Sequence, residues 1–182
     1  SAVERRVKTI RRAMTAPIRE YVYGYDDDTL WGRIVAELTT RGQTVALAES
    51  CTGGLIQKTL TDVPGASRVF TGGYVVYANE AKQTALNVPP AILARHGAVS
   101  AQVAALLARE SRRSLSADFG VSVTGIAGPG GGTAAKPVGL VWIALADAQG
   151  ESQHTFQFTG TRELVRIKTM KSALYLLWRR IV

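Results

Sequence analysis

The sequence contains one cysteine, Cys51, and two histidines, His96 and His154. A single cysteine cannot form an internal disulfide bond, and one cysteine with two histidines is too small a set for a zinc site with four protein ligands. We therefore expect no metal site and no disulfide framework, and we expect the reducing cytoplasm as the compartment.

Long apolar stretches are also absent. The longest unbroken one extends from Val141 to Ala146, whereas a membrane-spanning helix needs roughly 20 apolar residues. The N-terminus is basic, but it lacks the apolar segment and the cleavage site of a signal peptide. The sequence therefore predicts a chain that does not associate with a membrane.

The chain has fewer acidic than basic residues, and such an excess of positive charge is typical of proteins that bind nucleic acid. The 182 residues carry 22 Lys and Arg against 14 Asp and Glu, a formal net charge of +8. This charge gathers at the two ends, because residues 1–20 carry +4, residues 161–182 carry +5 and the 140 residues between them carry −1. No base-reading motif accompanies the charge, so we rank nucleic-acid binding well behind ligand binding.

The composition, with 46% hydrophobic and 20% charged residues, is typical of a folded domain with a sizeable core. The pattern of residues 3–20 predicts a basic helix, which Gly24 and the acidic run Asp26 to Asp28 interrupt. The first residue is Ser rather than Met, so we expect a fragment of a longer chain. Residues 1–26 would be a basic helical extension left from a preceding domain or linker, and residues 27–182 would form the domain.

From residue 28 onward, helical and strand patterns alternate along the chain. This order predicts an α/β fold, a three-layer α/β/α sandwich around a mainly parallel mixed sheet with an antiparallel edge near the end. The expected helices cover 28–41, a segment opened by Ser50 or Thr52, a segment from Asn79, 100–115, and a segment from Thr161. The expected strands cover 44–48, 73–78, 118–124, 138–146 and 152–158, and Pro89-Pro90 is expected as a turn.

One candidate binding segment runs from Ala48 to Gly54, where a strand turns sharply into a helix. The hydroxyls of Ser50 and Thr52, together with the first free N–H groups of the helix, could face a phosphate or a carboxylate there. The alternative is that both hydroxyls simply cap the helix and that the glycines fit a tight turn.

Two further segments combine glycine with polar residues after a strand, the edge at which open α/β sheets bind ligands. The loop 125–137 is rich in glycine, which lets a ligand approach the backbone, although a generic flexible loop fits the pattern too. It matches neither the dinucleotide fingerprint nor the phosphate loop. The segment 72–82 could bring Tyr77 and Lys82 to one spot, although each alone is typical of a half-buried aromatic and a solvated lysine.

Familiar catalytic patterns are missing, because the chain has neither a Gly-x-Ser-x-Gly elbow nor a Ser-x-x-Lys pair. Cys51 could be a nucleophile beside a helix N-terminus, but a small buried residue is the more common role of a free cysteine. From the residues alone, the prediction ends at an α/β ligand-binding domain.

Five segments, in this order and spacing, resemble the CinA C-terminal domain, a family that includes the nicotinamide mononucleotide amidases. The resemblance extends from about Asp27 to Val182. The segments are Ala48-Glu-Ser-Cys-Thr-Gly-Gly54, Tyr77-Ala-Asn-Glu-Ala-Lys82, His96-Gly-Ala-Val-Ser100, Thr124-Gly-Ile-Ala-Gly-Pro129 and Lys136-Pro-Val-Gly139.

The resemblance implies hydrolysis of the carboxamide of nicotinamide mononucleotide to nicotinic acid mononucleotide and ammonia, without a cofactor. It implies a dyad of Ser67 as nucleophile and Lys82 as base, with Tyr77 as a further catalytic group. It also implies a homo-oligomer, such as a dimer. The substrate-binding residues that we assign on the same basis are Ser50, Thr52, Gly53, Gly54, Thr124, Gly125 and Arg162.

Two alternatives remain open at this point. Ser50 is the more obvious serine by position, so the nucleophile is either Ser67 or Ser50. The domain could also be a non-catalytic nucleotide-binding module of a longer CinA protein, or a module associated with competence or DNA damage.

Overall fold

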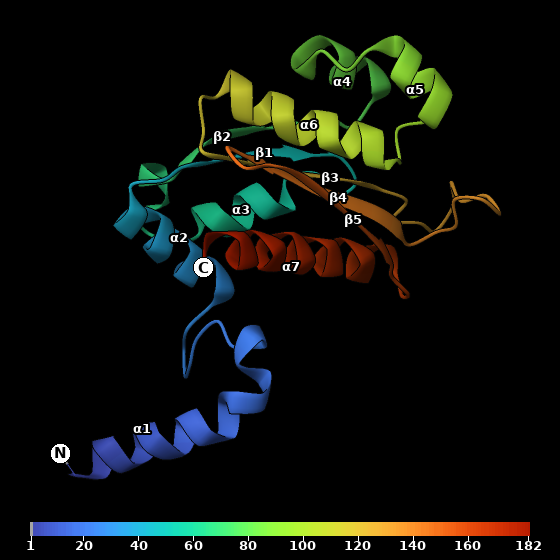
Figure 1. Cartoon of the computed structure of the whole chain (residues 1–182). Helices are drawn as coiled ribbons and strands as arrows, with labels where there is room; N and C mark the ends of the chain where they lie inside the picture. The colour runs from blue at the N-terminus through green and yellow to red at the C-terminus, as the bar shows by residue number, and fades with distance from the viewer. Residues whose placement is uncertain (1) are drawn as a thin grey trace.

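A five-stranded mixed sheet forms the centre of the protein, in the order β2-β1-β3-β4-β5 (Figure 1). The computed structural model describes residues 2–182, apart from the side chain of Glu20. Strands β2, β1 and β3 are parallel, and β4 and β5 add the antiparallel edge that the sequence predicts. The strands are β1 (Val45–Glu49), β2 (Phe70–Val75), β3 (Phe119–Gly125), β4 (Leu140–Asp147) and β5 (Gly150–Gln157).

Helices cover both faces of the sheet and complete the predicted α/β/α sandwich (Figure 1). One layer holds α2, α3 and the long C-terminal helix α7, and the other holds α6 with α4 and α5 outside it. The bounds are α2 (Leu30–Arg41), α3 (Leu55–Thr61), α4 (Asn79–Leu86), α5 (Pro90–His96), α6 (Ala101–Ser114) and α7 (Arg162–Ile181), with a short 3-10 helix η2 at Ala66–Arg68.

The central strands consist mostly of apolar residues because both of their faces are buried in the core. All five residues of β1 are buried, because helices cover the sheet on both sides there. The main apolar cluster joins β1, β3 and β4 to one stripe of α7, which contributes Val165, Met170, Leu174 and Trp178. This packing fixes the carboxyl ends of β1, β2 and β3 at one edge of the sheet.

Several element boundaries differ from the sequence prediction. Strand β2 begins at Phe70 and ends at Val75, three residues earlier than expected. Pro90 begins helix α5 rather than a turn, since proline fits the first position of a helix, where its missing N–H would have no partner anyway. The cap of α2 is Thr29, whose hydroxyl accepts from the Gly32 N–H, rather than Asp28.

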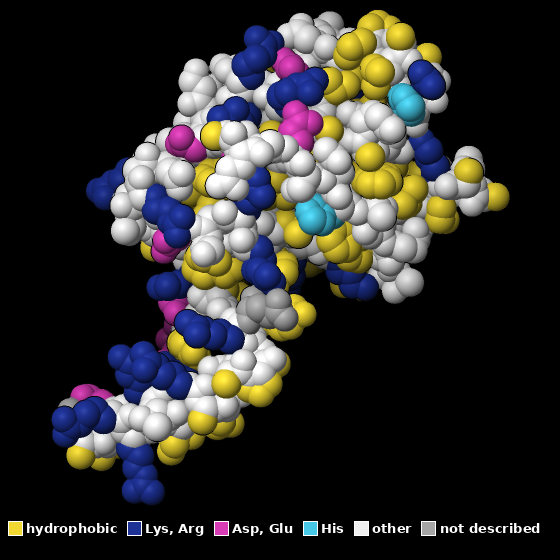
Figure 2. All heavy atoms as spheres, viewed as in Figure 1, with side chains coloured by type: hydrophobic (Ala, Val, Ile, Leu, Met, Phe, Trp, Pro, Cys, Tyr) yellow, Lys and Arg dark blue, Asp and Glu magenta, His cyan; other side chains and the backbone are white. Residues whose placement is uncertain are grey.

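The N-terminal extension lies apart from the sandwich (Figure 1). Helix α1 (Ala2–Thr15) buries none of its described residues, and the 3-10 helix η1 (Ala16–Tyr21) follows it where Pro17 ends the α-helical pattern. Basic and apolar side chains occupy different faces of α1 (Figure 2). Among residues 2–182, no helix is both long enough and apolar enough to cross a bilayer.

Candidate functional site

A cavity of about 270 Å³ opens at the edge of the sheet where the parallel strands end. Ser50 comes from the turn after β1, Tyr77 and Lys82 from the segment after β2, and Thr124 from the end of β3. Arg162, the first residue of α7, completes the set. With Gly125, which also lines the cavity, six of the predicted catalytic and substrate-binding residues therefore meet in one place.

Lys82 is the largest fully buried side chain among those that the structure describes, with only 1% of its surface exposed. Its Nζ donates to the carbonyl oxygens of Val76 and Tyr77, at 2.7 and 3.0 Å, and lies 3.3 Å from the Ser50 Oγ. Burial lowers the pKa of Lys82 from its usual value, and the neighbouring Cys51 and Glu80 oppose this only in part. The site thus pairs a serine hydroxyl with a lysine that loses its proton more readily than a lysine in water.

Glu49 explains why the Ser50 hydroxyl is free for this contact. The Glu49 side chain is completely buried and caps α3, because its Oε2 accepts from the N–H groups of Gly54 and Ile56 and its Oε1 accepts from that of Gln57. Glu49 therefore caps the helix, and Ser50 does not, contrary to the alternative interpretation of the sequence. The sequence analysis missed Glu49, because it lies six residues before the start of α3 and so outside the usual capping position.

Ser67 lies at the other end of β2, so a single chain does not bring Ser67 into contact with Lys82, as the predicted dyad requires. Ser67 belongs to η2, which precedes β2, and Lys82 follows β2. The strand of six residues separates them by roughly 20 Å, at about 3.3 Å per residue. Ser67 is exposed and lines no part of the cavity, and the serine that contacts Lys82 is Ser50.

Thr52, Gly53 and Gly54 were predicted to bind substrate, but they do not line the cavity. Thr52 is buried, and its carbonyl accepts from the Arg166 guanidinium at 2.7 Å. Gly53 and Gly54 have φ of +60° and +93°, so they serve the tight turn that leads into α3. The N-terminus of α3 holds the Glu49 carboxylate and is therefore not an open anion site.

The glycine-rich loop after β3 forms the opposite wall, as the sequence predicted for Thr124 and Gly125. The Thr124 hydroxyl donates to the Ala98 carbonyl at 2.9 Å. Farther along, the backbone N–H groups of Gly128 and Gly130 donate to no backbone acceptor among residues 2–182. Glycine here leaves the backbone accessible to a bound molecule.

Arg162 spans the mouth of the cavity. Its Nη1 donates to the Gly128 carbonyl at 2.9 Å, and its Nη2 donates to the Tyr77 hydroxyl at 2.8 Å. Tyr77 is 57% exposed, so this pair borders solvent. No Asp or Glu lines the cavity, whereas Lys82 and Arg162 do, and the site therefore favours an anionic ligand.

Cys51 also touches the cavity, but its chemistry is suppressed. Burial raises the pKa of the Cys51 thiol to about 12, so the thiolate needed for nucleophilic attack is scarce at neutral pH. Among residues 2–182, no cluster of three or more His, Cys, Asp or Glu side chains could hold a metal ion. The reactive pair that the geometry offers is therefore Ser50 with Lys82.

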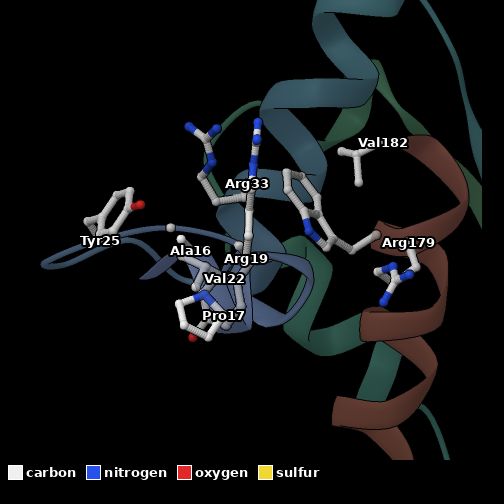
Figure 3. A pocket seen from close by; sticks show the side chains of 11 residues that line it. Ala16, Pro17, Arg19, Val22, Tyr25, Arg33, Arg179 and Val182 are labelled. Atoms are coloured by element: carbon white, nitrogen blue, oxygen red, sulfur yellow. The ribbon is translucent and has the colours of Figure 1, made fainter. Parts of the chain in front are cut away.

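A larger groove, of about 870 Å³, lies at the junction of the N-terminal extension with the sandwich (Figure 3). Arg19 of η1 and Arg33 of α2 line it, together with Val182 at the end of the chain. The groove contains no serine, cysteine or lysine. It therefore lacks the nucleophile and base that the smaller cavity brings together.

The cavity and its glycine-rich wall lie within the part of the chain that matches a known family. The model of the CinA C-terminal domain matches residues 27–181. The chain belongs to the CinA family. The basic extension, residues 1–26, lies outside that match, and the cavity residues named above lie inside it.

Relatives of this CinA chain carry names without a stated reaction. A putative competence-damage inducible protein of Moorella thermoacetica is 48% identical over 89% of this chain and 39% of its own length. A CinA-like protein of Thermosynechococcus vestitus is 47% identical over 98% of this chain and 45% of its own length. The chain thus spans less than half the length of the curated relatives that it matches.

Solved structures share the fold over nearly their whole length. The competence/damage inducible protein CihA of Agrobacterium tumefaciens is 42% identical, with a TM-score of 0.81, over 86% of this chain and 96% of that one. A CinA superfamily protein of Escherichia coli is 28% identical, with the same TM-score, over 90% of this chain and 98% of that one. The sandwich that positions the cavity is therefore the fold of the family.

Proposed function

We propose that this CinA domain hydrolyses the carboxamide of nicotinamide mononucleotide, with Ser50 as the nucleophile and Lys82 as the general base. The observation that carries the proposal is the contact between the buried Lys82 Nζ and the Ser50 Oγ inside a cationic cavity. A serine is a weak nucleophile until a neighbouring base takes its proton, and a desolvated lysine can do so. The family resemblance supplies the substrate.

The first step forms an acyl-enzyme. Neutral Lys82 accepts the Ser50 hydroxyl proton while the Oγ attacks the carboxamide carbon, which gives a tetrahedral intermediate with a negative oxygen. The N–H groups of Gly128 and Gly130, which line the cavity and donate to no backbone acceptor among residues 2–182, could stabilise this oxyanion. Protonated Lys82 then gives the proton to the departing nitrogen, and ammonia leaves.

The second step regenerates the enzyme. Water loses a proton to Lys82 and attacks the ester carbon of the acyl-enzyme, and the returning proton restores the Ser50 hydroxyl. The product is the carboxylate of nicotinic acid mononucleotide. Each proton taken up by Lys82 is released within the same half-reaction, so the chemistry needs no cofactor.

Arg162 is the residue that would bind the phosphate of the proposed substrate. Its two donors now serve the Gly128 carbonyl and the Tyr77 hydroxyl, which are neutral acceptors. A phosphate accepts the same fork with a negative charge opposite the guanidinium, and such bidentate Arg–phosphate pairs are among the strong hydrogen-bonded pairs. Binding of the nucleotide would therefore exchange weaker partners for a stronger one.

The test is ammonia release from nicotinamide mononucleotide by the wild type and three variants, Ser50→Ala, Lys82→Ala and Ser67→Ala. We expect the first two variants to lose activity by about 10²-fold or more, because each removes one member of the nucleophile–base pair. Ser67→Ala is the matched control and should keep most of the activity. Far-UV circular dichroism checks that all three variants fold.

Two outcomes would overturn the proposal. A wild type that binds the nucleotide but releases no ammonia would identify the domain as a binding module. An active Ser50→Ala protein beside an inactive Ser67→Ala protein would move the nucleophile to Ser67, and the catalytic pair would then have to be formed between two chains.

A further inference from the structure

The glycine-rich loop after β3 has little backbone support of its own. None of the backbone N–H groups of residues 127–132 donates to a backbone carbonyl among residues 2–182, and residues 129–135 are all exposed. The same segment contributes Gly128 and Gly130 to the cavity, where the proposed mechanism needs their N–H groups at a fixed place. Contacts made by side chains therefore have to determine where this loop lies.

Two side-chain hydrogen bonds tie residues 127–137 to other described elements. Arg162 donates to the Gly128 carbonyl, and the Lys136 Nζ donates to the His96 carbonyl. The first bond is the one that the proposed substrate would remove, because its phosphate draws the guanidinium away from Gly128. While the substrate is bound, the bond from Lys136 is then the one that remains.

The backbone of Lys136 is fixed by a tight turn. The Thr133 N–H donates to the Lys136 carbonyl at 2.8 Å, and the Lys136 N–H donates back to the Thr133 carbonyl at 3.2 Å and to its hydroxyl at 3.0 Å. The Lys136 side chain is half-buried and forms no salt bridge with a described residue. Its charged ammonium group is instead directed at the His96 carbonyl, and a charged donor makes a stronger hydrogen bond than a neutral one.

The acceptor belongs to a segment that borders the cavity. His96 is the last residue of α5, and Ala98 and Val99, just after it, line the cavity. A Cβ atom on Gly97 would lie 2.9 Å from the Lys136 Nζ, so a larger residue there would crowd the ammonium group. The contact thus joins two walls of the cavity. It also joins 96–100 and 136–139, two segments of the family resemblance that the proposed mechanism leaves without a role.

We propose that Lys136 is a positioning residue, whose bond to the His96 carbonyl holds the glycine-rich loop and keeps the N–H groups of Gly128 and Gly130 in place during the reaction. This role rests on the proposed function, which assigns these N–H groups to the oxyanion. Lys136 itself lines no part of the cavity, so it acts through the loop and not on the substrate. Its contribution is greatest once the substrate has drawn Arg162 away from the loop.

The first measurement compares kcat and KM for ammonia release from nicotinamide mononucleotide between the wild type and Lys136→Met. Methionine keeps most of the length and the apolar stem of lysine but donates no hydrogen bond. We expect kcat to fall by about 10- to 100-fold, because a displacement of about 1 Å at the reacting groups has an effect of this order, and KM to change little, because the substrate contacts remain.

Lys58→Met is the matched control. Lys58 donates to the Asp62 carboxylate on the surface of α3 and lines no part of the cavity. This variant loses the same donor group from another place on the domain, so its kcat and KM should equal those of the wild type. Far-UV circular dichroism checks that both variants fold.

The second measurement follows the loop without any substrate, by ¹⁵N relaxation of the Gly130 and Gly131 amides, which lie between the two side-chain bonds. We expect their order parameters to fall in Lys136→Met and to stay at the wild-type values in Lys58→Met. These signals come from the folded protein, so a loss of stability alone would not lower them.

Several results would overturn the proposal. They are a Lys136→Met protein with wild-type kcat, an equal loss of kcat in Lys58→Met, and a loss of kcat while the order parameters of Gly130 and Gly131 stay unchanged. A rise in KM without a fall in kcat would place Lys136 in substrate binding and would overturn it too. A wild type that releases no ammonia refutes the proposed function itself, whereas the relaxation measurement still decides whether Lys136 holds the loop.

Discussion

Replacing Glu49 with glutamine tests whether the cap of α3 holds the catalytic turn. The Glu49 side chain is fully buried and accepts three backbone hydrogen bonds, at 3.0 Å from Gly54, 3.1 Å from Ile56 and 2.8 Å from Gln57. Glutamine keeps one carbonyl oxygen, but its NH₂ group would meet an N–H donor where a carboxylate oxygen stood. At least one backbone donor therefore loses its partner.

The expected cost follows from these contacts. One lost hydrogen bond to a charged group contributes about 1.5–3 kcal/mol, and the lost charge at the helix N-terminus adds about 0.3–1 kcal/mol. We therefore expect Glu49→Gln to lower the free energy of unfolding by about 2–4 kcal/mol, as measured by urea denaturation followed by circular dichroism. Because the same turn positions Ser50, kcat for ammonia release should fall as well.

Glu37→Gln is the control for this measurement. Glu37 pairs with Arg41 on the surface of α2, at 2.7 Å in an i,i+4 arrangement, and such pairs contribute about 0.3–0.5 kcal/mol. A Glu49→Gln protein whose stability falls no further than that of Glu37→Gln would refute the reasoning. So would a clear loss of stability with unchanged kcat, because Ser50 would then keep its position without the cap.

Two further predictions concern the cavity. Burial lowers the pKa of Lys82, so kcat should fall at low pH as Lys82 becomes protonated and rise with pH as it loses its proton. The midpoint of this rise should lie below 10.5, the usual lysine value. A pH–rate profile without the rise would contradict the role of base. Arg162→Ala should raise KM for nicotinamide mononucleotide by about 10- to 100-fold, as expected for lost charge-assisted bonds, and leave KM for nicotinamide riboside, which lacks the phosphate, nearly unchanged; an equal effect on both substrates would argue against a phosphate contact.

The fold was predictable because its signals are local. The buried run 119–124 and the caps Ser100 and Thr161 each determine a strand or a helix from a few neighbouring residues. Both capping hydroxyls accept from an N–H three residues later, as the sequence pattern suggests. The order of these elements then restricts the topology to few choices, and the layered sandwich is one of them.

The start of α3 was harder to predict because its cap comes from outside the usual position. Gly54 precedes the helix and has no side chain to cap it. The Glu49 side chain reaches across the turn from the last residue of β1, so the acceptor lies five residues before the first N–H that it binds. A search for Ser or Thr beside the helix therefore selects Ser50 and Thr52, whose hydroxyls do not perform this role.

Separation along the sequence is a poor guide to which serine lies beside Lys82. Ser67 is 15 residues from Lys82 in the sequence, but strand β2 runs between them, so the two residues lie at opposite ends of that strand. Ser50 is 32 residues from Lys82 and touches it, because β1 and β2 are parallel neighbours whose carboxyl ends meet at one edge. In a parallel sheet, residues just after one strand lie close to residues just after the adjacent strands. Residues just before a strand lie at the other end of the sheet and cannot reach the same site within one chain. This rule places Ser50, and not Ser67, beside Lys82 within one chain.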